Sequence, residues 1–213
     1  MPTGVHIRDA REQLFAAAER VLLRDGPNAL TSRAVTAEAG VAKGVLHRHF
    51  ADFDTFIVEL MRDRVSRIEL QGAALLEAAG TGTVAGNLTG ALTDLFGSIA
   101  MSIVALVIFR DDLRIRLREE GLGRLPVLTQ GVAMIRAYLT AERDLGRIAA
   151  GADIDTIGLT LTGSGHLLFA DLFAEGNGAE RAASAIEEMV ASVLAGATAA
   201  DRALCPSRGD DSP

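Results

Sequence analysis

The sequence is poor in aromatic residues, lysine and cysteine. Tryptophan is absent and aromatic residues make up 4% of the 213 positions, so the hydrophobic 49% is mainly aliphatic. Such a composition favours packed helices over a β-sandwich. The single cysteine excludes an intramolecular disulfide and a cysteine-rich metal site. Lys43 is the one lysine among 21 basic residues.

No segment predicts a membrane helix or an export signal. The longest charge-free apolar run, Leu95–Phe109, has 15 residues, short of the roughly 18 that indicate a membrane span. The first ten residues, MPTGVHIRDA, lack the apolar stretch of a signal peptide. We therefore expect a soluble, cytoplasmic protein with no membrane partner.

Charge is distributed unevenly along the chain. The formal net charge is −7, yet Met1–Ser66 holds nine basic and nine acidic residues, so the rest of the chain carries the whole negative excess. Within Leu30–Phe50, three basic residues stand against one acid, Glu38. A basic spot on an acidic molecule is compatible with nucleic-acid binding at that spot.

Hydrophobic spacing predicts a chain made entirely of helices. Thr31 and Asp52 are expected as N-caps, and Gly40 as the turn between two short helices. The segment Val84–Phe109 is expected to form one continuous central helix, buried on several faces. The predicted helices cover Arg8–Asp25, Thr31–Ala39, Ala42–Phe50, Asp52–Ala79, Val84–Phe109, Arg110–Glu120, Pro126–Arg143, Ile154–Phe173 and Ala182–Ala197.

Two short helices joined by a glycine-containing turn, with a longer helix on either side, are typical of a helix-turn-helix. Leu30–Phe50 reads LTSRAVTAEAGVAKGVLHRHF and resembles the DNA-binding segment of the TetR family of bacterial transcriptional repressors. The similarity extends over about Arg8–Leu60. The residues at the family's core and turn positions are Leu30, Val35, Ala39, Gly40, Val41, Leu46 and Phe50.

The resemblance implies an all-α fold with two domains. A three-helix helix-turn-helix DNA-binding domain is expected over residues 8–68, and a helical ligand-binding and dimerisation domain over residues 69–200. Residues 201–213 are expected to be a disordered tail. In the family the last two helices pair with a second subunit, which implies a homodimer that reads a palindromic operator in double-stranded DNA. The long helix that ends at a Gly/Thr cluster, residues 80–83, would link the two domains.

The resemblance also assigns the DNA contacts. Hydroxyl and guanidinium groups at a helix start suit phosphates, Arg48 can fork onto guanine, and Val45 can meet a thymine methyl. Gly44 lets the backbone approach DNA without a Cβ atom. His47 and His49 are two residues apart and point to different sides of a helix, so no metal site is predicted. The expected DNA-binding residues are Thr31, Ser32, Arg33, Lys43, Gly44, Val45, His47, Arg48 and His49.

Three positions depart from the family pattern. Ala42 replaces the usual serine at the start of the recognition helix, which removes a cap worth about 1 kcal/mol. His47 replaces a common tyrosine, and Phe53 stands where a lysine often contacts phosphate. Each missing phosphate contact reduces the salt dependence of binding by about 0.9 in log–log slope. We therefore expect weaker nonspecific DNA binding.

The C-terminal half is expected to bind a hydrophobic small-molecule effector. Polar and aromatic groups on otherwise apolar helices are the candidate lining, although a histidine such as His166 is more often a satisfied buried residue and a methionine such as Met134 more often part of the core. Interior glycines of the central and penultimate helices favour close helix packing over a cavity. The face formed by Gly158, Thr162 and Gly165 is expected to approach the symmetry mate. The candidate pocket residues are Asn87, Phe109, Arg110, Met134, Tyr138, His166 and Phe169.

Enzyme signatures fail in their context, so no catalytic residue and no cofactor is predicted. A GxGxxA match at residues 80–85 follows a predicted helix and not a strand. The segment Gly163–His166 resembles the GxSxG nucleophile motif of hydrolases. That motif requires a turn between a strand and a helix, whereas this segment lies within a predicted helix. Two alternatives stay open: a helical interaction protein that keeps the fold and no longer binds DNA, suggested by Ala42, Phe53 and the acidic total, and a small-molecule enzyme.

Overall fold

The computed structural model describes residues 7–97, 99–174, 178–195 and 197. Its elements in that part of the chain are α-helices and one 3-10 turn, which confirms the all-α class. The predicted tail, residues 201–213, lies outside the described residues. No helix in the described part is both long and apolar enough to cross a membrane. The elements are α1 (Ile7–Asp25), η1 (Pro27–Ala29), α2 (Ser32–Glu38), α3 (Gly44–His49), α4 (Phe53–Glu77), α5 (Val84–Phe96), α6 (Ile99–Phe109), α7 (Asp111–Glu119), α8 (Pro126–Asp144), α9 (Ile154–Ala174) and α10 (Gly178–Leu194).

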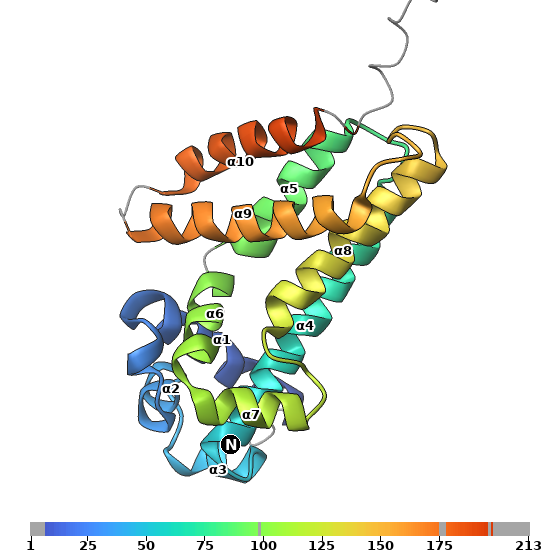
Figure 1. The fold of residues 1–213 in the computed structure, drawn as a ribbon. Helices are drawn as coiled ribbons and strands as arrows, with labels where there is room; N and C mark the ends of the chain where they lie inside the picture. Colours follow the sequence, from blue (N-terminus) through green and yellow to red (C-terminus); the bar gives the residue numbers. More distant parts are fainter. Residues whose placement is uncertain (1–6, 98, 175–177, 196, 198–213) are drawn as a thin grey trace, which may run out of the picture.

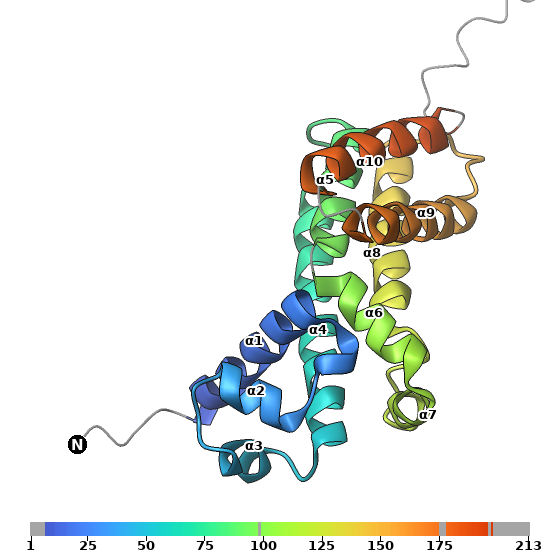
Figure 2. The same ribbon diagram turned by 90° about the vertical axis from the view of Figure 1, so that its left-hand side faces the viewer.

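The long helices α4 and α8 lie side by side along the length of the molecule (Figure 1). At one end α9 and α10 pack against each other and against α8 and α5, respectively. At the other end α1, α2 and α3 gather around the start of α4, as Figure 2 shows. Helix α6 contacts α1 and η1, and α7 contacts α4. Helix α4 thus belongs to both ends of the molecule.

Side-chain caps fix where three of the helices begin. Thr31 accepts a hydrogen bond from the amide of Ala34 at 3.1 Å, and Asp52 accepts one from the amide of Thr55 at 2.6 Å. Both predicted N-caps are confirmed. Thr83 caps α5 in the same way through the amide of Gly86. Each cap satisfies one of the amides that a helix start leaves without a partner.

The prediction of one continuous helix over Val84–Phe109 is wrong. Helix α5 ends at Phe96, and Gly97 leaves the helical region with ψ 131° while its amide still bonds to Thr93 at 2.8 Å. A Cβ atom at position 97 would lie 3.1 Å from the carbonyl oxygen of Thr93. Periodicity could not show this break because both halves are apolar, so their hydrophobic stripes join without a visible gap.

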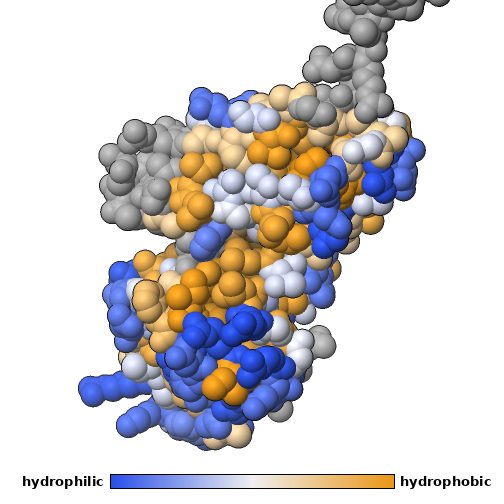
Figure 3. All heavy atoms as spheres, in the orientation of Figure 1, coloured by the Kyte–Doolittle hydropathy of each residue, from blue (hydrophilic) through white to orange (hydrophobic). Residues whose placement is uncertain are grey.

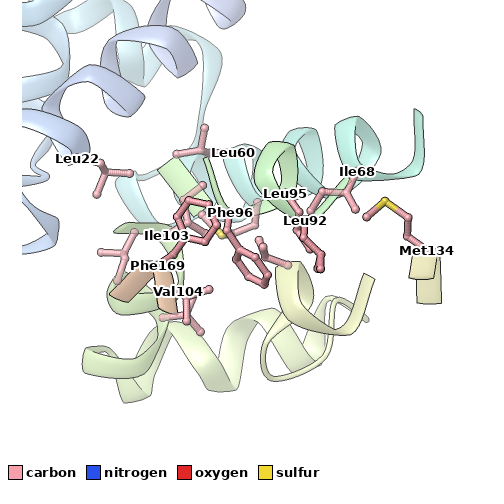
Figure 4. Packing of buried hydrophobic residues seen from close by; sticks show 14 of the residues in the cluster. Leu22, Leu60, Ile68, Leu92, Leu95, Phe96, Ile103, Val104, Met134 and Phe169 are labelled. Atoms are coloured by element: carbon pink, nitrogen blue, oxygen red, sulfur yellow. The ribbon is translucent and has the colours of Figure 1, made fainter. Parts of the chain in front are cut away.

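One cluster of buried apolar residues extends along α4 from one end of the molecule to the other. At the end formed by α1, α2 and α3, Phe15 on α1, Phe50 after α3 and Phe56 on α4 form an aromatic cluster with ring centroids 5.1–5.8 Å apart. At the other end, Leu92 and Phe96 pack with residues of α6 and α9, including Phe169 (Figure 4). Truncating a buried leucine or phenylalanine of this kind to alanine costs about 2 to 5 kcal/mol.

Candidate functional site

The turn between α2 and α3 is closed by two backbone hydrogen bonds. The amide of Gly40 bonds to Ala37 at 3.1 Å and the amide of Val41 to Thr36 at 3.0 Å. This pattern is a Schellman motif, which requires a residue with positive φ at the turn. Gly40 has φ 65°, as the sequence predicted. The turn therefore fixes the direction in which α3 leaves α2.

Helix α3 divides into a core face and a solvent face. Leu46 has no exposed surface and Phe50, four residues later, is 3% exposed, so this side is anchored in the aromatic core. The expected DNA-contacting side chains Lys43, His47 and Arg48 are all exposed, as is Gly44. Positions 43 and 47, and positions 44 and 48, are neighbours on a helix surface. The structure therefore brings these four positions together on one accessible surface.

The cations on this surface have no internal partner. Arg33, Lys43 and Arg48 form no ion pair with any residue that the structure describes. The nearby acid, Glu38, is instead held by Arg20 and Arg24 of α1, each at 2.7 Å. These two hydrogen bonds lower the pKa of Glu38. The positive charges of α2 and α3 are thus left available to a polyanion.

The start of α2 presents two hydroxyl groups with different roles. Thr31 is exposed, but its oxygen is already the cap acceptor for the amide of Ala34. The Oγ of Ser32 is buried and has no hydrogen-bond partner among the described residues. Arg33 beside it is exposed. The structure therefore places all three predicted residues at one helix start.

Val45 and His49 are half-buried. The end of α3 is held by Arg11, a residue that the sequence did not point to. Arg11 on α1 donates to the carbonyl of His49 at 3.5 Å and to the carboxylate of Glu59 on α4 at 2.9 Å. Its guanidinium also lies 4.5 Å from the ring centroid of Phe50, within cation–π range. In the sequence, Arg11 stands out only by lying three residues before the core residue Leu14. This spacing does not reveal its distant partners His49 and Glu59.

Two of the family departures have visible structural consequences. Helix α3 begins without a side-chain cap, because Lys43 at the cap position makes no such bond. Phe53 is half-buried and stacks on Phe56 with ring centroids 5.6 Å apart. Phe53 is therefore part of the aromatic core.

In the described part of the chain, the contacts of the seven predicted pocket residues fall in separate places. Asn87 bonds to Tyr138, while His166 and Phe169 pack around Phe96 on another side of α5. Met134 is buried on α8, where its side chain lies 3.3 Å from the Cβ position of Gly72 on α4. These contacts place core residues between helices and outline no single effector site.

Two of these seven residues lie at the junction with the DNA-binding helices. Phe109 is 77% exposed, and Arg110 bonds to Asp54 on α4 at 2.9 Å. Both line a small cavity of about 160 Å³ beside Pro27 and Leu30. Their predicted grouping with Tyr138 and His166 is not what the structure shows.

The prediction for the glycine face of α9 is also corrected. A Cβ atom at Gly158 would lie 2.7 Å from Arg136, and one at Gly165 would lie 2.9 Å from Phe96, so both glycines face their own subunit. The outward face carries Leu159, Gly163 and Leu167 at spacings of four residues, and the two leucines are 65% and 66% exposed. A groove of about 480 Å³ between α9 and α10 continues this apolar face.

The comparisons with known proteins agree with this geometry. Residues 14–59 match the model of the bacterial regulatory proteins, tetR family, over a segment from α1 into α4. Escherichia coli NemR in its reduced form is 17% identical with a TM-score of 0.69, covering 90% of this chain and 100% of that chain. A TetR-family transcriptional regulator from Agrobacterium tumefaciens is 12% identical with a TM-score of 0.68, covering 91% and 100%.

A third solved structure is the transcriptional regulator FadR from Bacillus subtilis in complex with stearoyl-CoA. It is 16% identical with a TM-score of 0.65, covering 85% of this chain and 98% of that chain. At these identities the likeness of the solved structures concerns the fold alone. No curated protein matches the sequence.

Proposed function

Because the chain belongs to the TetR family of bacterial regulatory proteins, which bind DNA and regulate transcription, we propose that it is a repressor that binds a palindromic operator as a homodimer and is released by a small molecule. The observation that carries this proposal is the solvent face of α3, where Lys43 and Arg48 stand exposed without an internal ion pair. Residues 8–68 would form the DNA-binding domain and residues 69–200 the effector and dimerisation domain.

Helix α3 would enter the major groove as the recognition helix. Arg48 would read guanine bidentately and Val45 a thymine methyl, while Lys43, His47 and His49 would contact bases or adjoining phosphates. Thr31, Ser32 and Arg33 would hold the neighbouring phosphates, which position the protein and carry no sequence information. Gly44 would let the backbone approach a phosphate closely.

The dimer would form through α9 and α10. Leu159 and Leu167 are large apolar side chains with about two thirds of their surface exposed, and the groove beside them is lined by Leu168 and Met189. Such a contiguous apolar face is typical of a protein interface. A twofold axis through it would present two copies of α3 to successive turns of DNA, about 34 Å apart.

The effector would bind among α5, α6 and α9, around Phe96. The ring of His166 lies 6.1 Å from that of Phe96, and the Nδ1 atom of His166 is buried without a hydrogen-bond partner among the described residues. Burial lowers the pKa of His166, so its imidazole is neutral at pH 7. A neutral ring nitrogen in an apolar surround suits a mainly hydrophobic molecule with one polar group.

Release follows if the effector binds the DNA-incompetent spacing of the two α3 helices more tightly than the competent one. A coupling of 1 to 3 kcal/mol lowers operator affinity by about 5- to 150-fold. Stearoyl-CoA is a first probe, because the Bacillus subtilis regulator of the same fold was solved with it. A molecule that binds by calorimetry and leaves operator affinity unchanged contradicts release by that molecule.

The DNA-binding proposal is tested with two recognition-helix variants and a matched control. On the operator, Lys43→Ala should lower the salt slope by about 0.9, and Arg48→Ala should cost about 1 to 3 kcal/mol and relax specificity at one base pair. Arg67→Ala removes an exposed arginine that pairs with Asp63 on α4, and it should bind like the unaltered protein. Equal binding by all three variants favours the alternative, a helical interaction protein whose DNA contacts have been lost.

The dimer is tested by molar mass in solution. We expect the unaltered protein to be a dimer and Leu167→Glu to shift it to monomer. Leu70→Glu is the control, because Leu70 is 71% exposed but lies on α4. A monomeric unaltered protein at micromolar concentration, or a dimer that Leu167→Glu leaves intact, argues against this interface.

A further inference from the structure

Two arginines beside and within α7 bond to the first turn of α4. The Nη2 atom of Arg110 lies 2.9 Å from the carboxylate of Asp54. Arg116 lies 3.2 Å from the carboxylate of Asp52 and donates to the hydroxyl of Thr55 at 2.6 Å. Asp52 is itself the N-cap of α4. Both arginines therefore hold the point where the chain passes from α3 into α4.

The far end of α7 is tied to α4 as well. Arg62 on α4 lies 2.6 Å from the carboxylate of Glu120, the residue that ends α7. Leu113 and Leu117 of α7 are buried, so the helix keeps an apolar anchor of its own. Helix α7, which Figure 1 shows near the start of α4, thus has polar contacts to α4 at both of its ends and two buried leucines between them.

These ion pairs suit positioning better than stabilisation. The side chains of Arg110 and Arg116 are 32% and 33% exposed, and those of Asp54 and Asp52 are 39% and 55% exposed. Partly exposed ion pairs add little to the free energy of unfolding. Several such pairs with fixed geometry can still select one orientation of the α3–α4 corner among nearly equal ones.

Charge placement across the corner supports the same conclusion. Helix α3 carries exposed cations, whereas the corner that follows it carries the two acids Asp52 and Asp54. Unpaired, these carboxylates would lie close to the surface proposed to meet phosphates and would repel DNA. Arg110 and Arg116 compensate the charge of these carboxylates. Because the two arginines belong to the α7 region, the cations of α3 are not used for this purpose.

We propose that Arg110 and Arg116 are positioning residues for operator binding, which hold α3 in its DNA-reading place through Asp52, Asp54 and Thr55. The inference rests on the proposed DNA-binding function. It assigns Arg110 to the link between the domains, where the sequence had suggested an effector contact. The two arginines act without reading bases themselves, so their effect is on orientation and on the local charge of the corner.

The test compares Arg110→Ala and Arg116→Ala with Arg114→Ala. Arg114 lies on the same helix but pairs with Asp111 on α7 and donates to the carbonyl of Ile108, and it makes no ion pair or side-chain hydrogen bond to α4 among the described residues. In the absence of DNA, the amides of residues 53–57 should exchange hydrogen faster in the two test variants and not in the control. Operator affinity should fall about two- to fivefold for each test variant.

Conservative variants separate positioning from a general loss of structure. Arg116→Lys keeps the charge and should recover most of the operator affinity. Adding Asp54→Ala to Arg110→Ala should cost no more than either substitution alone, because the pair is already broken. Thermal unfolding of every variant should stay within a few degrees of the unaltered protein.

The outcomes distinguish a failure of the positioning role from a failure of the DNA-binding proposal. If the unaltered protein binds an operator and both test variants bind and exchange like Arg114→Ala, the positioning role is wrong and the DNA-binding proposal stands. If the unaltered protein binds no operator, the proposed function fails and the positioning role fails with it.

Discussion

The side-chain amide of Asn87 on α5 donates a hydrogen bond to the hydroxyl of Tyr138 on α8 at 2.9 Å. Tyr138 has no exposed surface, and the same amide of Asn87 also bonds to the carbonyl of Thr81 at 3.0 Å. This pair therefore joins two helices and the loop before α5 inside the C-terminal domain. Both residues were candidates for an effector pocket, and the structure gives them a connecting role.

Tyr138 should make stability fall at high pH. Burial is the main reason that the pKa of Tyr138 is raised to about 12, from an ordinary value near 10. The stability that follows from this shift is fully present below about pH 10 and is lost as pH rises through about 12, because the unfolded chain releases the proton first. Denaturation followed between these pH values should show this loss.

Tyr138→Phe is the control for this pH effect. It should remove that part of the pH dependence and cost about 0.5 to 1.5 kcal/mol at neutral pH through the lost hydrogen bond. Since Tyr138 is the only tyrosine and tryptophan is absent, the ultraviolet absorbance band of tyrosinate, where phenylalanine and the peptide bond do not absorb, reports this side chain alone. A tyrosine absorbance change in the folded protein with a midpoint near 10 would overturn the assignment.

Glu142 should be the most sensitive acid of the C-terminal domain. Its side chain is fully buried, accepts a hydrogen bond from the amide of Gly80 at 3.2 Å and lies 3.3 Å from Arg147. Glu142→Ala should destabilise the protein by about 2 to 4 kcal/mol in urea unfolding, because it leaves the amide of Gly80 without its acceptor and removes the carboxylate that faces Arg147, whose remaining hydrogen bonds go to the carbonyls of Thr81 and Gly82. Asp144→Ala, two residues later and 71% exposed, should change stability by less than about 0.5 kcal/mol.

Two glycines of the helix-turn-helix should respond in opposite ways. Gly40 has φ 65°, so Gly40→Ala should destabilise the protein by about 1 to 2 kcal/mol although the space around it is open. Gly44 lies in α3 with nothing within 4 Å of its Cβ position, so Gly44→Ala should stabilise the free protein by about 0.4 to 1 kcal/mol.

The same Gly44→Ala variant should bind the operator less tightly, because the added methyl group meets the phosphate backbone. Thermal unfolding and a DNA-binding titration of the one variant measure the two effects separately. Gly44→Ala that stabilises the protein and binds DNA with unchanged affinity would remove Gly44 from the contact surface.

Close helix packing at Gly165 should make substitution there costly. A Cβ atom at this position would lie 2.9 Å from the ring of Phe96, so Gly165→Ala should cost about 1 to 3 kcal/mol. Gly90→Ala on α5 is the matched control, since nothing lies within 4 Å of its Cβ position, and it should stabilise by up to about 1 kcal/mol. Equal effects of the two substitutions in urea unfolding contradict the packing argument.

Local signals in the sequence were sufficient for the helix-turn-helix. The capping and turn hydrogen bonds involve partners only three residues away, as at Thr31, Gly40 and Asp52. A short stretch of sequence therefore contains the whole interaction. The alternation of Leu46 with exposed neighbours likewise follows from helix geometry alone. Capping and turn chemistry are local, which is why these predictions were confirmed.

The C-terminal half depends on partners that are distant in the sequence. The neighbouring Asp112 is a local partner of Arg110, but nothing near Arg110 shows that it also pairs with Asp54, 56 residues earlier. The glycines of α9 have the same spacing whether they face their own subunit or a second one, and only packing against Phe96 distinguishes these cases. The residue type alone does not tell whether a leucine such as Leu159 is exposed or buried. The outward apolar face of α9 is therefore seen only in the folded chain (Figure 3).

The most direct test of the account is selection of random DNA fragments by the purified protein at two salt concentrations, read by sequencing. We predict an enriched palindrome with half-sites about one helical turn apart, weakened at the higher salt and lost in the Lys43→Ala/Arg48→Ala double variant. No enrichment at low salt by protein freed of bound small molecules, or an enriched sequence that the double variant selects equally well, would contradict DNA recognition by α3.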